Sequence, residues 1–106
     1  MSDFLDLKGA SGRSYRFRLD DGPTPSPMGG NYCFVRREGR SASPIVLGVA
    51  ASLATARDGW AAARERGATH LYTRLNVARG ARAAEHDDMV AALSSSVMTE
   101  ARDEVV

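Results

Sequence analysis

The sequence predicts an α+β fold: a small antiparallel three-stranded sheet flanked by two helices, with an added N-terminal hairpin. Three observations lead to this prediction. The first half of the chain contains short runs in which apolar and polar residues alternate, and the second half carries apolar residues at helical spacing. Clusters of proline and glycine separate these segments. The chain of 106 residues is long enough for one domain with a single core.

The strands are predicted from apolar runs bounded by turn signals. Tyr15, Phe17 and Leu19 alternate with polar residues, which is the pattern of a half-buried strand. A loop rich in proline and glycine separates this hairpin from the core. The hairpin lies within residues 1–21, and the core strands cover residues 32–36, 45–49 and 70–75.

The helices are predicted from apolar residues spaced three or four apart. Ser52 offers a cap for the first helix, Gly59 weakens that helix without ending it, and Gly67 stops it. The second helix covers residues 79–95. The predicted domain spans residues 1–98, with its core at 29–93 and a short, frayed acidic tail at 99–106.

Composition narrows the classes of protein to which the chain can belong. Cys33 is the single cysteine, so no internal disulfide framework is expected and a reducing compartment fits. No apolar run approaches the roughly 18 residues that a membrane span needs, and the first residues are acidic rather than basic. These features predict a cytoplasmic protein without a membrane partner.

The net charge of +1 hides an asymmetry along the chain. Residues 8–82 hold 13 basic and five acidic side chains, whereas residues 83–106 hold one basic and six acidic side chains. The basic body could face phosphate groups. The acidic end could fold back over that body, bind a basic partner or keep the protein soluble. An ordinary solvated surface would also explain the basic body and the acidic end.

Short segments of the core resemble a nuclease signature. Gly30-Asn31-Tyr32-Cys33-Phe34 is similar to a Gly-Ile-Tyr-x-Phe motif, and Val46-Leu47-Gly48 stands where Tyr-Ile-Gly is expected. Leu53 lies five residues after Gly48, where a leucine is common, and residues 83–93 are similar to a closing helix. Over roughly residues 29–93, the chain therefore resembles the GIY-YIG nuclease superfamily.

The resemblance implies phosphodiester cleavage with one divalent metal ion. In that family tyrosines and a nearby base activate water, an arginine steadies the phosphate, and a helix glutamate holds the metal. Tyr32 matches the first tyrosine. Val46 replaces the second tyrosine, and Ala56 stands where the arginine is usual, with Arg57 beside it.

The glutamate position is also changed. Counting back along the closing helix places His86 where the family has its glutamate, and Glu85 precedes it. One residue turns a helix by about 100°, so Glu85 points away from the face of His86. A neutral histidine binds transition metals but is a poor ligand for magnesium, and a half-buried polar side chain is the simpler role for His86.

The favoured hypothesis is a catalytically degenerate GIY-YIG-like domain that binds a partner and needs no cofactor. It would bind DNA or another nucleic acid, or a protein through the exposed sheet face and the acidic end. The residues expected to contact nucleic acid are Arg36, Arg37, Arg40, Arg57 and Arg74.

Two alternatives remain. In the first, the chain is a divergent endonuclease that uses magnesium or manganese, with Tyr32 and Arg57 catalytic and with Glu85 and His86 as metal ligands. In the second, it is a small interaction protein unrelated to the family. The partner and the oligomeric state stay open.

Overall fold

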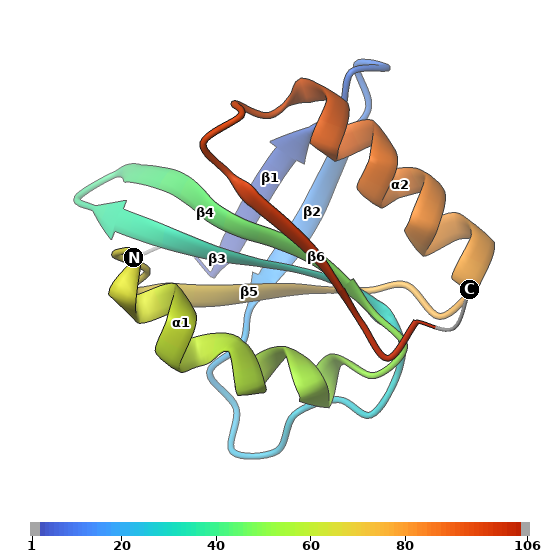
Figure 1. The fold of residues 1–106 in the computed structure, drawn as a ribbon, viewed down its shortest axis with the longest axis horizontal. Coiled ribbons are helices and arrows are strands. Elements are labelled where there is room, and N and C mark those ends of the chain that lie inside the picture. The colour runs from blue at the N-terminus through green and yellow to red at the C-terminus, as the bar shows by residue number, and fades with distance from the viewer. Residues whose placement is uncertain (1–2, 105–106) are drawn as a thin grey trace.

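The computed structural model describes residues 3–104, and within them six strands form one curved sheet with two helices packed against it (Figure 1). The sheet order is β1-β2-β5-β3-β4-β6. Neighbouring strands are antiparallel except β4 and β6, which are parallel. The elements are β1 (Phe4–Lys8), β2 (Ser14–Leu19), β3 (Gly30–Glu38), β4 (Ser41–Ala50), the 3₁₀ helix η1 (Leu53–Gly59), α1 (Trp60–Glu65), β5 (His70–Leu75), α2 (Arg79–Ala92) and β6 (Met98–Arg102).

The predicted three-stranded sheet flanked by two helices is therefore wrong. The strands β5, β3 and β4 lie side by side, but the sheet continues beyond them on both sides. The hairpin joins it through β2, where Arg18 pairs with Thr73 and Leu19 with Tyr72 of β5. On the other side β6 extends β4. Each of the added segments satisfies backbone hydrogen-bonding groups that the edges of a three-stranded sheet would leave open.

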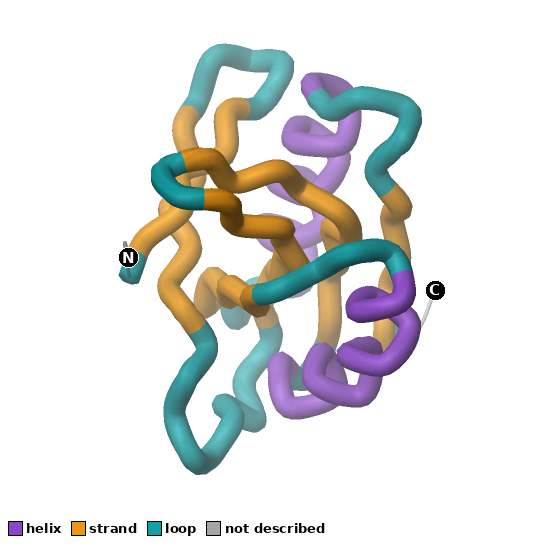
Figure 2. The backbone as a smooth tube through the Cα atoms, turned by 90° about the vertical axis from the view of Figure 1, so that its left-hand side faces the viewer, coloured by secondary structure: helices purple, strands orange, loops and turns teal. Residues whose placement is uncertain are grey.

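The region expected to be a frayed acidic tail contains β6 instead. Val46 to Ala50 of β4 pair in register with Met98 to Arg102. Parallel strands need a long crossover connection, and here the chain between β4 and β6 runs through η1, α1, β5 and α2. The last of these, α2, carries the chain from β5 to β6 (Figure 2). Residues 105–106 of the predicted tail and residues 1–2 of the predicted hairpin region lie outside the described residues.

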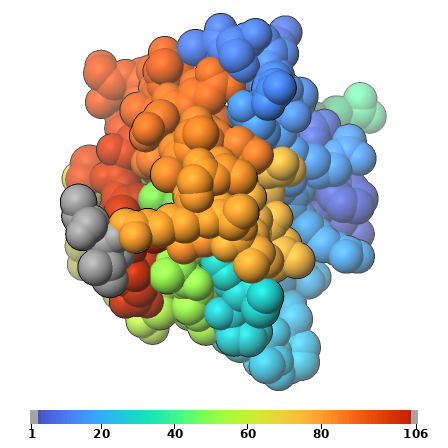
Figure 3. Space-filling model, turned by 90° about the vertical axis from the view of Figure 1, so that its right-hand side faces the viewer, coloured from blue at the N-terminus to red at the C-terminus, as the bar shows by residue number. Residues whose placement is uncertain are grey.

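Each face of the sheet has its own apolar cluster, because successive side chains along a strand point to opposite faces. One cluster lies beneath α2 and contains Phe17, Cys33 and Leu47, with Met89 from the helix. The other contains Tyr32 and Phe34, with residues of η1 and α1 packed against them. The sheet thus separates residues around α1 from residues around α2. Figure 3 shows the start of α2 at the centre of one side of the molecule, with the hairpin beside it.

The first predicted helix is divided in two. A 3₁₀ segment covers Leu53–Gly59, and the α-helix covers only Trp60–Glu65. Ser52 occupies the capping position with an extended backbone, but its side chain makes no capping hydrogen bond. Neither helix of residues 3–104 combines the length and apolar character that crossing a membrane requires.

The acidic end of the chain folds back onto the basic body. Glu85 of α2 pairs with Arg74, and Glu104 pairs with Arg82 and with Arg79. Of the three roles that the charge asymmetry left open, the structure shows the first. These pairings match three arginines of the body, Arg74, Arg79 and Arg82, with carboxylates of the acidic end.

Candidate functional site

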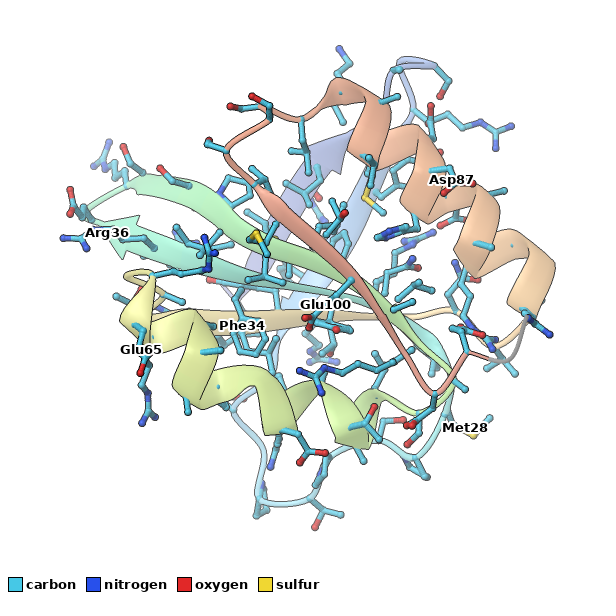
Figure 4. All side chains as sticks on the ribbon, in the orientation of Figure 1. Met28, Phe34, Arg36, Glu65, Asp87 and Glu100 are labelled. Atoms are coloured by element: carbon cyan, nitrogen blue, oxygen red, sulfur yellow. The ribbon has the colours of Figure 1, made fainter. Side chains whose placement is uncertain are left out.

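A small pocket opens between α1, β4 and β6, and it has a volume of about 80 Å³. Figure 4 shows Phe34 and Glu100 in this region, where β6 crosses near α1. The floor is largely apolar, whereas two arginines and one glutamate supply charge. The lining residues are Phe34, Val46, Gly59, Ala62, Ala63, Arg66, Met98, Glu100 and Arg102.

Glu100 and Arg102 of the pocket wall form a hydrogen-bonded group with Tyr32, which does not itself line the pocket. The hydroxyl group of Tyr32 donates to Oε1 of Glu100 at 2.5 Å, and Nε of Arg102 donates to the same oxygen at 3.1 Å. Tyr32 is fully buried, and burial together with the Glu100 carboxylate raises the pKa of its hydroxyl group well above the ordinary value. Tyr32 therefore stays protonated and acts as a hydrogen-bond donor.

The tyrosine ring is held in place by a glycine on the neighbouring strand. Tyr32 and Gly48 are direct partners in the antiparallel ladder. The ring lies so close to Gly48 that a Cβ atom there would come within 2.5 Å of ring atom Cε1. Gly30 is similarly enclosed, with Leu53 Cδ1 2.8 Å from the position of its missing Cβ. Two pairs of motif residues are therefore closely packed: Tyr32 against Gly48, and Leu53 against Gly30.

Gly59 makes room for Arg102 in the same way. A Cβ atom at Gly59 would lie 3.0 Å from Nη2 of Arg102 and 3.3 Å from Cε2 of Phe34. The glycine weakens the helical segment, but its missing side chain lets the guanidinium group of β6 pack against η1. The pocket thus presents Arg66 and the Glu100–Arg102 ion pair beside apolar walls.

Replacing Tyr32 with phenylalanine isolates the contribution of its hydroxyl group. The ring still fills the space over Gly48, but Glu100 loses a donor and keeps only Arg102. We expect the free energy of unfolding to fall by about 1 kcal/mol, measured by urea denaturation. Tyr15→Phe is the matched control, because Asp88 keeps its two hydrogen bonds from Ser11 when the Tyr15 hydroxyl is removed. An equal decrease in the free energy of unfolding in the two variants would contradict a special role for the contact between Tyr32 and Glu100.

The sequence-predicted catalytic residues are not assembled around Tyr32. Val46 and Ala56 share its apolar cluster and can only pack there. Arg57 points elsewhere: Nε and Nη2 donate to the Asp20 carboxylate at 2.9 and 3.1 Å, and this pairing raises the pKa of the guanidinium group. Nη2 of Arg57 also donates to the carbonyl oxygen of Gly22 at 2.6 Å.

The predicted metal ligands Glu85 and His86 lie on α2, on the other side of the sheet. Glu85 accepts a hydrogen bond from Nε of Arg74 at 2.9 Å. His86 is half-buried, burial lowers the pKa of its imidazole, and its Nδ1 has no hydrogen-bond partner in the described part of the chain. Among residues 3–104, no three side chains of His, Cys, Asp or Glu form a group suited to a metal ion.

The five arginines predicted to contact nucleic acid have different surroundings. Arg57 and Arg74 are half-buried and paired with carboxylates. Arg37 donates to the hydroxyl group of Tyr72 at 2.8 Å. Arg36 is exposed beside Glu38, and Arg40 is exposed in the two-residue turn between β3 and β4, where Gly39 takes a positive φ of 60°.

Sequence reasoning missed Glu100, Arg102 and Arg66. Glu100 and Arg102 belong to the stretch that was expected to fray. Arg66 follows the last residue of α1, a position where exposed arginines are common and suggest no function. The spacing of Glu100 and Arg102 by two residues was the available signal, because it places both side chains on one face of a strand. Their approach to Tyr32 depends on a pairing across 68 residues.

Comparison with known proteins identifies no relative of this chain. No family model, curated protein or solved structure matches the chain.

Proposed function

We propose that this chain is a relative of the GIY-YIG nucleases that binds nucleic acid without cleaving it. One observation carries the proposal: the hydroxyl group of Tyr32 is engaged by Glu100, among apolar neighbours that include Val46 and Ala56. The residues that could replace the missing chemistry, Glu85 and His86, lie across the sheet. A tyrosine in this setting supports the fold rather than the activation of water.

The distribution of exposed arginines supports nucleic acid as the partner. The exposed basic residues of the described chain gather mainly in two groups, one on the β1–β2 hairpin and one where α1 and β3 end. Guanidinium groups at such positions can contact phosphates, and these contacts supply most of the affinity in sequence-independent binding. Figure 4 places Arg36 and Glu65 at the second of these regions. The two groups are Lys8, Arg13, Arg16 and Arg18, and Arg36, Arg40, Arg64 and Arg66.

We place this function in the cytoplasm, without a membrane partner. Cys33 supports that proposal, because a chain with a single cysteine has no internal disulfide and fits a reducing compartment. Burial raises the pKa of its thiol to about 12 and keeps the thiol unreactive. The thiol packs within β3 and has no role in the proposed binding.

The test combines binding with cleavage. The whole chain is mixed with labelled single-stranded DNA, duplex DNA and RNA, and the bound fraction is followed in gel-shift assays over a series of salt concentrations. We expect binding at low salt that weakens steeply as salt rises. In parallel, supercoiled plasmid is incubated with the protein and magnesium or manganese, and we expect no nicking.

Each possible failure has its own meaning. No shift at low salt with any nucleic acid would overturn the proposal and point to a protein partner. Nicking that disappears in Tyr32→Phe or in the Glu85→Ala/His86→Ala double variant would overturn the non-cleaving function and favour the endonuclease. Nicking that persists unchanged in both variants would indicate a contaminating nuclease.

A further inference from the structure

The outward face of the β1–β2 hairpin is a sheet surface that no helix covers. Leu5, Leu7, Tyr15 and Phe17 point inward and belong to the cluster beneath α2. The alternate residues point the other way, and every one of them is exposed. These outward residues are Phe4, Asp6, Lys8, Ser14, Arg16 and Arg18.

An aromatic ring and two guanidinium groups lie together on this face. Phe4 pairs with Arg18 in the ladder, and the residue is 44% exposed. The Cζ atoms of Arg16 and Arg18 lie 4.9 and 6.0 Å from the centre of that ring. Both cations are thus held close to a flat apolar surface that is still open to solvent.

The same face continues onto β5. Arg18 pairs with Thr73, so Thr73 and the residue two positions later, Leu75, point to the same side as the arginines. Leu75 is 62% exposed, the largest exposed fraction among the large apolar side chains of the described residues. Apolar side chains therefore lie on either side of the arginine pair.

The charge of the face is positive, and its one acidic side chain does not block it. Asp6 accepts hydrogen bonds from Nε and Nη2 of Arg16 at 2.9 and 3.1 Å. Both side chains of this pair are largely exposed to solvent, with exposed fractions of 62% and 48%. A surface ion pair of this kind exchanges easily for another anion. Lys8 and Arg18 add further positive charge on the same side.

This combination fits one class of partner. Single-stranded nucleic acid offers phosphates for arginines and open base faces that stack on aromatic rings or on guanidinium planes. In duplex DNA the base faces are stacked on one another, so an aromatic ring such as that of Phe4 could stack on a base only at the cost of unstacking the duplex. We propose that the outward face of the β1–β2 hairpin binds single-stranded nucleic acid, with Phe4 stacking on a base and Arg16 and Arg18 contacting phosphates. This inference rests on the proposed nucleic-acid binding and names its surface and its strand type.

The first experiment measures affinity. Binding of the whole chain to fluorescein-labelled oligodeoxythymidine is followed by fluorescence anisotropy over a range of salt concentrations. We expect Phe4→Ala to weaken binding about tenfold. Arg16→Gln/Arg18→Gln should weaken it and reduce the slope of log affinity against log salt by about 1.4, because two phosphate contacts are lost. Arg36→Gln/Arg40→Gln tests the second basic group and should weaken binding less than Arg16→Gln/Arg18→Gln does. Arg79→Gln on α2, an exposed arginine outside both groups, is the control and should stay within twofold of the wild-type protein.

The second experiment reports contact with the bases. Phe4→Trp places a fluorophore on the face, and we expect its emission to be quenched when oligodeoxythymidine binds. The wild-type protein serves as the control, because its single tryptophan, Trp60, lies on α1 and should show no quenching. Circular dichroism of every variant checks that the fold is kept, and the tryptophan variant keeps an aromatic ring if Phe4→Ala does not fold.

The outcomes separate this inference from the proposed function. If the wild-type protein binds, but only Arg36→Gln/Arg40→Gln weakens binding, the surface is wrong and nucleic-acid binding stands. Equal affinity for duplex and single strand, with no effect of Phe4→Ala and no quenching at position 4, would overturn base stacking. If the wild-type protein binds no nucleic acid at low salt, that result overturns both the proposed function and this inference.

Discussion

Replacing Gly48 with alanine is expected to destabilise the protein by about 3 kcal/mol, the upper end of the usual cost of overpacking a tight core. The added methyl group would overlap the ring of Tyr32, which is fully buried. The ring is held at two points, because its hydroxyl group is bound by Glu100 and its edge contacts Phe34 at a centroid distance of 6.1 Å. A domain of this size has a total stability of only about 5–15 kcal/mol.

Gly80→Ala provides the matched control for this substitution. Gly80 lies in α2, its φ is not positive, and a Cβ atom there would meet nothing within 4 Å. Alanine in a helix is favoured over glycine, so we expect Gly80→Ala to stabilise the protein by about 0.5–1 kcal/mol. Urea denaturation of both variants measures the contrast. A Gly48→Ala protein as stable as the wild-type protein would show that the ring is not confined as the structure describes.

Replacing Arg82 with methionine is expected to cost about 3 kcal/mol, because removing one member of a buried ion pair leaves its partner uncompensated. Arg82 is 6% exposed and donates to both carboxylate oxygens of Glu104. It also donates to the carbonyl oxygen of Val77 at 2.7 Å. Arg79→Met is the control: it lies on the same helix and faces the same carboxylate at 3.6 Å, but its side chain is 57% exposed. We expect that control to stay within about 0.5 kcal/mol of the wild-type protein.

The Arg82 variant also has a predicted dependence on pH. The hydrogen bonds from Arg82 hold the pKa of Glu104 below its ordinary value of 4.5. A carboxyl group with a lowered pKa in the folded state stabilises the protein above its ordinary pKa, and that contribution is lost as the pH falls. The stability gap between the wild-type protein and Arg82→Met should therefore be widest near neutral pH and should narrow below about pH 4.5. A gap that is constant with pH would contradict the ion pair as its cause.

Sequence patterns located the segments whose side chains are buried in a regular alternation. In β2 the buried Tyr15 and Phe17 alternate with exposed polar residues, and the apolar run of β4 is buried on both faces. Strand β6 was not predicted, because Met98, Thr99 and Ala101 are exposed and the strand has no pattern of buried apolar residues. Its place is set by backbone pairing with β4, which carries no side-chain signature.

The functional roles of the charged residues were harder to predict than the strands. Arg57 was singled out because it neighbours the position of a family arginine, yet its orientation depends on Asp20, 37 residues earlier. Arg74 was expected to face a ligand and instead faces Glu85. A single sequence lists charges in order, but which pairs meet is decided by the fold. Local spacing therefore predicted the strands better than it predicted the site.

The fit between Tyr32 and Gly48 has a consequence for how such sequences change over time. A ring on one strand that fills the space left by a glycine on the next ties the two positions together: a larger residue at one requires a smaller one at the other. Selection for folding alone would then keep a tyrosine opposite a glycine long after any reaction had ceased. In a lineage of such chains, this pair should covary as a unit, while neighbouring polar positions drift independently.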